Sequence, residues 1–269
     1  MNKKISILGC GWLGLPLAKA LIAHQYRVNG TTTTPQKIEI LSEVGIGPFL
    51  ISLSEDGIVG NLNGFIGESD TLIVNIPPNL RAAKKENFIN KIRHLARAIQ
   101  DTGLKNLIFI SSTSVYGDIV GHITEEAGPR PDTESGQQLF AAESILRKIP
   151  GLNTTIIRFG GLIGPNRHPI THLAGRKDLP NGNERVNLIH LDDCIGLIIT
   201  ILNNNYWNRT FNGVYPYHPT KKEYYTSEAV KKGLFPPCYL SDPIEKEYKT
   251  IGNSDDNVKI YPYTTTIIS

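Results

Sequence analysis

The sequence has only three cysteines, Cys10, Cys194 and Cys238, with neither metal-ligand spacing nor the even number of a disulfide framework. We therefore expect reduced thiols, no metal site and a cytoplasmic location. Hydrophobic runs are short, and none approaches the roughly 18 residues of a membrane span. Residues 1–4 lead directly into a strand pattern and do not resemble a signal peptide. These absences argue against a secreted or membrane-embedded protein.

Charge of either sign is also modest. The net charge is +3 over 269 residues, and the charged residues are interspersed. This balance is too weak and too dispersed to predict a nucleic-acid or membrane partner. Hydrophobic residues make up 40% of the chain, which is enough to bury a large core in one domain or slightly more. Nothing in the sequence indicates the oligomeric state.

The most informative stretch is the Gly-x-Gly-x-x-Gly pattern of Gly9, Gly11 and Gly14. It follows a short apolar run and opens an amphipathic stretch, which is the strand–turn–helix context of a dinucleotide-binding loop. Gly9 permits the tight turn, Gly11 lets a pyrophosphate approach the backbone, and Gly14 lets the helix pack against the strand. We expect Trp12 and Leu13 to contact the cofactor too, because the amides of the first helical turn favour anions. The alternative is an ordinary glycine-rich turn without a ligand.

Cys10 lies inside this loop. Its thiol is either oxidisable or only a small side chain that fits the turn, and the sequence leaves both interpretations open.

The end of the second expected strand, 26–30, selects the cofactor. NAD binding usually uses an acidic residue there for the ribose 2′-hydroxyl, whereas this chain has Thr31, Thr32 and Thr33. An acidic residue would repel a 2′-phosphate, whereas hydroxyls and backbone N–H groups can donate hydrogen bonds to it. We therefore favour NADP over NAD, with Arg27 and Lys37 as the nearest cations. The alternative is a polar loop in which Thr34 caps a helix expected over 35–42.

Strand and helix patterns alternate along the chain. We expect strands at 49–51, 70–76, 107–110 and 153–158, and a long helix from about 83 to 102. Recurring strand, crossover and strand predict an α/β fold with a Rossmann-like, doubly wound parallel sheet. Ligands of such folds lie at the carboxyl ends of the strands. We therefore expect the residues that close the fourth strand to line the cofactor, namely Asn75, Ile76, Pro77 and Pro78.

A hydroxyl-rich cluster ends the fifth strand, including Ser111 and Ser112. It is either a nicotinamide or substrate contact, or a serine-rich turn that caps the sheet edge. The segment Ser-Ser-x-x-Val-Tyr-Gly, which ends at Gly117, resembles the motif that closes the fifth strand of extended short-chain dehydrogenase/reductases of the nucleotide-sugar epimerase/dehydratase group. The segment 158–165 resembles that family's arginine-to-Gly-Pro segment, and 186–193 resembles its Ile-His-x-x-Asp block.

The resemblance implies a catalytic Tyr-x-x-x-Lys on the next helix, acting with a serine at the strand end. Here Ser135 stands where the family has the tyrosine, and Leu139 stands where it has the lysine. The chain is therefore similar to atypical members that keep the fold and the cofactor loop. If it catalyses, we expect Ser112 to polarise a substrate oxygen, with Tyr116 or a water relaying the proton.

The resemblance also assigns roles downstream. It implies nicotinamide contacts from Phe159, Gly160, Gly161 and Leu162, and substrate contacts from Arg158, Asn166 and Arg167. For Arg158 a salt bridge beneath the sheet is an equally open alternative. His190, Asp192 and Asp193 suggest a His/Asp site, but in this family the block mainly ties the small lobe to the main one.

The expected organisation is a cofactor domain over 1–160 and a small C-terminal substrate lobe over 161–269, with 186–203 returning to the core. We expect a strand at 210–214 and a helix at 221–232 within this lobe. The functional prediction is an NAD(P)-binding oxidoreductase-like protein that acts on or senses a small molecule. The alternatives are a non-catalytic NADP(H) sensor or scaffold and a nucleotide-sugar epimerase/dehydratase.

Overall fold

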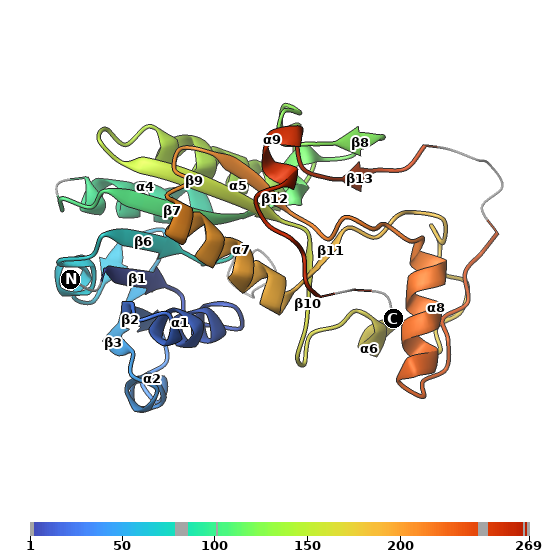
Figure 1. Cartoon of the computed structure of the whole chain (residues 1–269), viewed down its shortest axis with the longest axis horizontal. Helices are drawn as coiled ribbons and strands as arrows, with labels where there is room; N and C mark the ends of the chain where they lie inside the picture. The colour runs from blue at the N-terminus through green and yellow to red at the C-terminus, as the bar shows by residue number, and fades with distance from the viewer. Residues whose placement is uncertain (1–2, 79–85, 101, 242–246, 266, 268–269) are drawn as a thin grey trace.

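The computed structural model describes residues 3–78, 86–100, 102–241, 247–265 and 267. Its centre is a parallel sheet of seven strands in the order β12-β9-β7-β6-β1-β2-β3 (Figure 1). The strands are β1 (Lys4–Leu8), β2 (Arg27–Thr32), β3 (Gly47–Leu50), β6 (Thr71–Val74), β7 (Asn106–Ser112), β9 (Asn153–Phe159) and β12 (Thr210–Gly213). This is the predicted Rossmann-like α/β fold.

Helices cover both faces of the sheet because successive side chains of a buried strand point to opposite faces. On β6, Leu72 and Val74 pack with α3 (Leu62–Ile66), α4 (Phe88–Ile99) and α5 (Glu134–Arg147). Ile73 points the other way, into the core formed with α1 (Gly14–Ala23), α2 (Lys37–Glu43) and α7 (Leu191–Asn204). The sheet is thus packed between the two cores, which hold the loops at its carboxyl edge in place.

The chain reverses its winding direction between β1 and β6, which are neighbours in the sheet. From this point the strands proceed outward in both directions, and the loops that follow β1 and β6 separate. Such a switch point is where ligands of open α/β sheets bind.

A smaller unit continues beyond this edge. It contains the paired strands β10 (Gly161–Ile163) and β11 (Leu188–His190), the short helix α6 (Ile170–Leu173) and the helix α8 (Lys221–Lys231), around a third hydrophobic cluster. The remaining short elements are β4 (Ser52–Leu53), β5 (Ile58–Val59), η1 (Thr113–Tyr116), β8 (His122–Ile123), β13 (Thr250–Ile251) and α9 (Asp255–Val258).

The strand expected at 210–214 exists, but its predicted place in the small lobe is wrong. β12 pairs with β9 in parallel and forms the edge of the main sheet. The chain therefore leaves the main sheet after β9, builds β10 and β11, and returns to it twice, as α7 and as β12. The division into two domains at residue 160 stays a prediction.

Several expected element boundaries also need correction. The strand expected at 26–30 extends to Thr32, so part of the threonine row belongs to β2. The helix expected from about 83 begins at Phe88, because the Asn87 side chain accepts the Asn90 N–H at 3.1 Å and caps it; residues 79–85 and 101 lie outside the described part. Thr34 does not cap α2, whose N-cap residue is Gln36 without a side-chain hydrogen bond.

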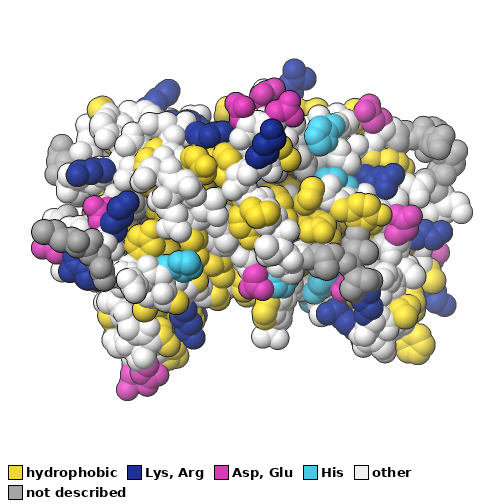
Figure 2. All heavy atoms as spheres, viewed as in Figure 1, with side chains coloured by type: hydrophobic (Ala, Val, Ile, Leu, Met, Phe, Trp, Pro, Cys, Tyr) yellow, Lys and Arg dark blue, Asp and Glu magenta, His cyan; other side chains and the backbone are white. Residues whose placement is uncertain are grey.

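Charge is spread over the visible face in Figure 2, where both basic and acidic side chains are scattered among uncharged ones. None of the described helices combines the length and apolar character needed to cross a bilayer. All three cysteines are free thiols, as predicted.

Candidate functional site

The loop between β1 and α1 contains glycines that the surrounding backbone requires. Gly9 has φ +106°, and a Cβ there would lie 2.5 Å from the Asn75 carbonyl oxygen. A Cβ on Gly14 would lie 2.1 Å from the Gly9 carbonyl oxygen. Gly11 differs, because a Cβ built on it would meet no heavy atom within 4 Å. Two of the glycines are thus explained by packing, and the third faces open space.

The amides of this loop divide in the same way. The Gly9 N–H donates to Thr31 Oγ1 at 2.8 Å, and the Cys10 N–H donates to the Thr31 carbonyl at 2.9 Å. No described residue accepts a hydrogen bond from the N–H of Gly11, Trp12 or Leu13. Because α1 also lacks a side-chain N-cap, its positive end and these amides are available to an anion.

Asn75 holds the loop from the neighbouring strand. Its side-chain amide donates to the Gly9 carbonyl at 3.0 Å, and its backbone N–H donates to Leu8 at 2.9 Å. The role of this side chain is therefore to fix the loop, although Asn75 also lines the adjoining space.

Two cavities, of about 320 and 430 Å³, open on either side of the loop and share Gly11, Asn75, Ile76 and Pro77 as walls. They form one groove along the carboxyl edge of the sheet. We call the first the inner cavity; its other walls are Trp12, Leu13, Pro78, Ile110, Ser111, Ser112, Leu139, Leu162 and Arg167. We call the second the outer cavity; its other walls are Leu8, Gly9, Cys10, Thr31, Thr32, Thr33, Thr34, Lys37, Ile51, Ser52, Leu53, Glu86 and Lys91.

Most of the predicted contact residues lie in these walls. The residues that sequence reasoning missed include Leu8, Ile51, Ser52, Leu53 and Ile110. They are ordinary strand-end or loop residues, and the sequence carries no signal that distinguishes them from others.

The outer cavity contains one of the two cations proposed beside the threonine row. Lys37 lines it, whereas Arg27 begins β2 at the opposite end of the strand. Lys91 also lines this cavity, but its ammonium pairs with Glu86. Thr32 Oγ1 accepts the Thr34 N–H at 3.0 Å and shapes the turn after β2.

Cys10 is a wall residue with a buried thiol. Burial raises the pKa of Cys10 to about 12, so the reactive thiolate is scarce at neutral pH. This favours the interpretation of Cys10 as a small residue that fits the turn.

Ser112 ends β7 in the wall of the inner cavity. Its hydroxyl oxygen accepts the Ser114 N–H at 3.1 Å and so caps η1, while no described residue accepts its own hydrogen bond. The capping interpretation of the serine cluster therefore holds for Ser112, and its hydroxyl hydrogen remains available to the cavity. Its contact with nicotinamide or substrate stays a prediction. Leu139 on α5 lines the same cavity and is 5% exposed. Where the family resemblance places a lysine, the wall is thus apolar.

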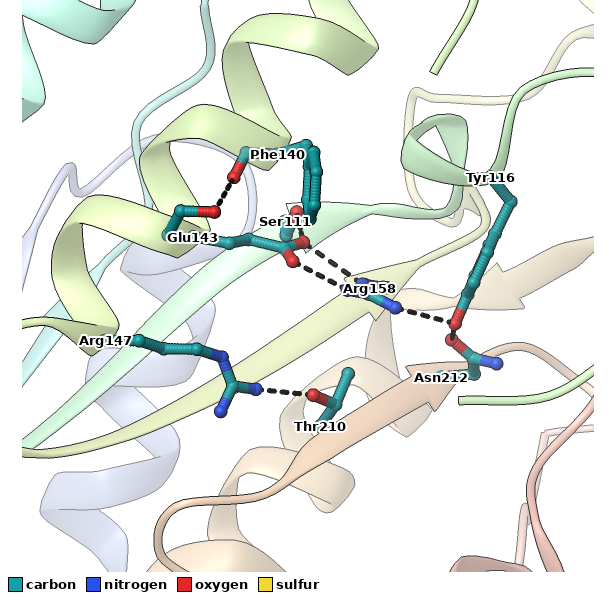
Figure 3. A network of polar contacts seen from close by, with 9 residues as sticks. Ser111, Tyr116, Phe140, Glu143, Arg147, Arg158, Thr210 and Asn212 are labelled. Atoms are coloured by element: carbon teal, nitrogen blue, oxygen red, sulfur yellow. Dashed lines mark hydrogen bonds and ion pairs between the residues drawn. The ribbon is translucent and has the colours of Figure 1, made fainter. Parts of the chain in front are cut away.

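Ser111, beside Ser112, also lines the inner cavity, but its hydroxyl is committed to another side chain. Its hydroxyl donates to Glu143 Oε1 at 2.6 Å in the buried layer between β7 and α5 (Figure 3). Glu143 in turn accepts from Arg158 Nε at 3.1 Å and from Nη2 at 2.7 Å. Burial alone disfavours the charged guanidinium, but the hydrogen bonds and charge of Glu143 outweigh it and raise the pKa of Arg158.

The proposed roles of Tyr116 and Arg158 are therefore wrong. Arg158 Nη1 donates to the Tyr116 hydroxyl at 2.9 Å, and that hydroxyl donates to Asn212 Oδ1 at 2.9 Å (Figure 3). Tyr116 is fully buried and Arg158 is 5% exposed, so neither reaches a ligand in the groove. Burial also raises the pKa of Tyr116, against a role in proton transfer. The salt-bridge alternative for Arg158 is confirmed.

The segment after β9 contributes less than expected. The Phe159 side chain is 2% exposed and packs in the core under Gly213, where a Cβ would lie 2.2 Å from its ring. Gly160 and Gly161 pack against the backbone of Asn187, whose carbonyl accepts the Gly161 N–H at 2.8 Å. Of these predicted nicotinamide contacts, only Leu162 lines the groove.

The Gly164–Arg167 turn contributes Arg167 to the wall of the inner cavity and is joined to the glycine loop. Trp12 Nε1 donates to the Pro165 carbonyl at 2.9 Å, and the Arg167 guanidinium carbon lies 4.9 Å from the centroid of the Trp12 ring. Asn166 occupies the exposed tip of this turn and does not line the cavity. Arg167 therefore reaches the site predicted for substrate, whereas Asn166 does not.

The His190–Asp193 block is structural. His190 Nδ1 accepts the Asp192 N–H at 3.2 Å and caps α7. Asp193 is fully buried and accepts from the Tyr261 hydroxyl at 2.9 Å and from the Thr264 N–H at 2.8 Å. It thereby ties the C-terminal segment to α7. Within the described part of the chain, no cluster of three or more His, Cys, Asp or Glu side chains is arranged to hold a metal ion.

Comparison with known proteins agrees with this geometry. The profile of the NAD dependent epimerase/dehydratase family matches residues 81–212. The chain is 35% identical over 254 residues to Protein YeeZ of Escherichia coli (strain K12), covering 94% of this chain and 92% of that protein.

Two solved structures share the fold. The UDP-glucuronic acid 4-epimerase from Bacillus cereus, in complex with UDP-glucuronic acid and NAD, has a TM-score of 0.79 at 18% identity, over 98% of this chain and 95% of that one. A short-chain dehydrogenase/reductase superfamily protein from Agrobacterium tumefaciens with bound NAD has a TM-score of 0.76 at 17% identity, over 98% and 93%. With its groove at the switch point, its matching profile and a relative along nearly its whole length, the chain belongs to the NAD-dependent epimerase/dehydratase family.

Proposed function

We propose that the protein binds a nicotinamide dinucleotide along the groove, NADP(H) in preference to NAD(H), and holds a small molecule in the inner cavity. In this proposal it is an oxidoreductase-like member of the atypical extended short-chain dehydrogenase/reductase type. The observation that carries the proposal is Gly11, which has open space where a Cβ would be and lies in the wall shared by both cavities.

The chain's own groups suit each part of such a cofactor. The amides of Gly11, Trp12 and Leu13, at the positive end of α1, suit the diphosphate. The outer cavity suits the adenosine half, with Thr31, Thr32 and Thr33 at the end of β2, and the inner cavity suits the nicotinamide half. When bound, the nicotinamide supplies hydride transfer to or from carbon.

The NADP preference rests on the charges of the outer cavity. Lys37 supplies a cation there, and the hydroxyl of Thr33 is exposed beside it. The one carboxylate among the described walls, Glu86, is neutralised by Lys91. A 2′-phosphate would therefore meet a cation rather than the acidic residue typical of NAD sites.

The inner cavity supports binding and orientation better than proton transfer. Ser112 can donate to a substrate oxygen, but Leu139 offers no charge and Tyr116 is buried beneath the sheet. A proton would have to come from water. Turnover therefore requires a reaction in which one hydroxyl and solvent suffice.

The apolar Leu139 specifically favours a second candidate, a protein that senses NADP(H) without turnover. Nucleotide-sugar epimerisation, the activity named for the Bacillus cereus neighbour, is a third candidate, but Ser135 and Leu139 replace the residues that the family resemblance implies for it. The three free thiols favour a cytoplasmic location for any of these functions.

The test is calorimetric titration of the protein with NADPH and NADH. Gly11→Val should abolish binding, because its side chain fills the space that the diphosphate needs. Gly128→Val is the matched control, since a Cβ at Gly128 also meets nothing within 4 Å but lies outside both cavities. Undiminished binding by Gly11→Val would refute the proposed cofactor site.

Turnover separates the two leading candidates. NADPH oxidation is monitored with panels of carbonyl compounds and sugar nucleotides. Oxidation that depends on an added compound and is lost in Ser112→Ala supports catalysis with Ser112 as the polarising group. Tight NADPH binding without oxidation in any mixture supports the sensor.

A further inference from the structure

We propose that Arg167 is the anion-binding group of the inner cavity and that the ligand held there carries a phosphate or carboxylate. This inference rests on the proposed function and specifies the ligand class of the same site. It depends on three observations: the rigidity of the turn that carries Arg167, the uncommitted guanidinium, and the absence of competing charge in the described walls.

The turn is fixed by its own hydrogen bonds. The Gly164 N–H donates to the Arg167 carbonyl at 2.9 Å, and the Arg167 N–H donates to the Gly164 carbonyl at 3.1 Å. Pro165 and Asn166 occupy the two central positions, and Asn166 has φ +56°, a conformation that asparagine tolerates in turns. The bond from Trp12 Nε1 to the Pro165 carbonyl then locks the turn onto the glycine loop. The backbone of Arg167 is thus held in place before a ligand arrives.

The guanidinium lies on an aromatic ring and is otherwise uncommitted. It stacks on Trp12 at 4.9 Å, which orients it without using its N–H donors. Among the described residues none accepts a hydrogen bond from this guanidinium, and no carboxylate forms an ion pair with it. Arg158 is the opposite case, with its donors committed to Glu143 and Tyr116.

The described walls of the inner cavity contain Arg167 and no aspartate, glutamate, lysine or histidine. The remaining surface is mostly apolar, with Leu139, Leu162 and Pro78, apart from the hydroxyl of Ser112. An anionic ligand therefore meets one oriented cation and no repelling carboxylate. Because Arg167 is exposed, water satisfies its five guanidinium donors when the ligand is neutral, whereas an anion gains charge-assisted hydrogen bonds from them.

Two sources of the anion fit this chemistry. One is a small molecule that is phosphorylated or carboxylated, with its reacting carbon directed toward Ser112. The other is the cofactor's own diphosphate, because Gly11 lines the same cavity. The experiment distinguishes the two.

Inorganic phosphate is the probe, and the broadening of its ³¹P resonance is measured as the protein is titrated, without and with saturating NADPH at low salt. The affinity for NADPH is measured separately by its fluorescence. The variants are Arg167→Gln, Arg167→Lys, and Arg176→Gln as the matched control. Arg176 is an exposed arginine that lines neither cavity.

If the anion belongs to a small molecule, phosphate binds in the presence of NADPH, and Arg167→Gln weakens phosphate about 10- to 100-fold while leaving NADPH within about twofold. If it belongs to the cofactor, NADPH displaces phosphate and Arg167→Gln weakens both. Arg167→Lys keeps the charge and retains part of the affinity in either case. Each of these results supports the inference.

Phosphate binding that is equal in the wild type, Arg167→Gln and Arg176→Gln overturns the inference, and so does a lack of phosphate binding by the wild type. These results leave the proposed function standing where NADPH still binds and Gly11→Val abolishes that binding. Conversely, a wild type that binds phosphate through Arg167 but does not bind NADPH refutes the proposed function alone.

Discussion

The buried Arg158–Glu143 pair offers the sharpest test of how the sheet supports the site. The two side chains are 6% and 3% exposed and share two hydrogen bonds, of 3.1 and 2.7 Å. Arg158→Met keeps most of the side-chain volume but leaves the Glu143 carboxylate with Ser111 as its remaining described donor. Breaking such a pair from one side should lower the free energy of unfolding by about 3–5 kcal/mol.

The assay is equilibrium urea denaturation followed by circular dichroism, with a double-mutant cycle. Arg158→Met combined with Glu143→Met removes both charges, so it should cost less than Arg158→Met alone. Lys221→Met is the control, because it breaks the Lys221–Glu184 pair, which is about one-third exposed, and should cost at most about 1 kcal/mol.

Two results would refute this reasoning. One is a cost for Arg158→Met as small as that of Lys221→Met, and the other is additive costs of the two methionine substitutions. A folded Arg158→Met protein should also bind NADPH as the wild type does. Loss of NADPH binding by a folded Arg158→Met protein would indicate that Arg158 takes part in ligand binding.

Further predictions concern the loop, the outer cavity and the small lobe. Gly9→Ala should destabilise the protein by more than about 1 kcal/mol in urea denaturation, because its Cβ would meet the Asn75 carbonyl and its φ is positive. Gly11→Ala should be nearly neutral in the same assay, because a Cβ there meets nothing. Equal costs of the two substitutions would contradict this. Lys37→Ala should weaken NADPH about tenfold in calorimetry and leave NADH unchanged, and equal weakening of both would remove Lys37 from the 2′-phosphate site. Burial lowers the pKa of His168 below 6.5 in the folded protein. Below this pH the His168 imidazole is protonated more readily in the unfolded chain than in the folded one, which favours unfolding. The free energy of unfolding of the wild type should therefore rise between about pH 5 and pH 7, and that of the His168→Asn protein should rise less over the same range. Identical pH profiles of the two proteins would contradict this.

The fold could be predicted from the sequence because its signals are local. The apolar run ending in Gly9, the helix that follows and the repeated strands each depend on neighbouring residues. The edge position of β12 could not be predicted in this way. Thr210–Gly213 is a four-residue segment, and only its pairing with β9, more than 50 residues earlier, places it in the sheet.

The groove was predicted well at its centre and poorly at its margins. Gly11 and Pro77 follow strands at the switch point, so topology alone brings them together. Tyr116 follows β7 and Arg158 lies in β9, but both side chains point into the layer between the sheet and α5 and not into the groove. Their direction depends on Glu143 of α5, which pairs with Arg158. The resemblance to a family supplies motif positions, whereas the direction of each side chain depends on packing between distant elements.

The central claim is that the amides after Gly11 receive the diphosphate of a nicotinamide dinucleotide. A crystal structure of the protein with NADPH tests it most directly. The account predicts diphosphate oxygens within hydrogen-bonding distance of the N–H groups of Trp12 and Leu13, with the nicotinamide in the inner cavity beside Ser112. A dinucleotide bound away from this loop, or a loop closed by protein atoms in the complex, would contradict it.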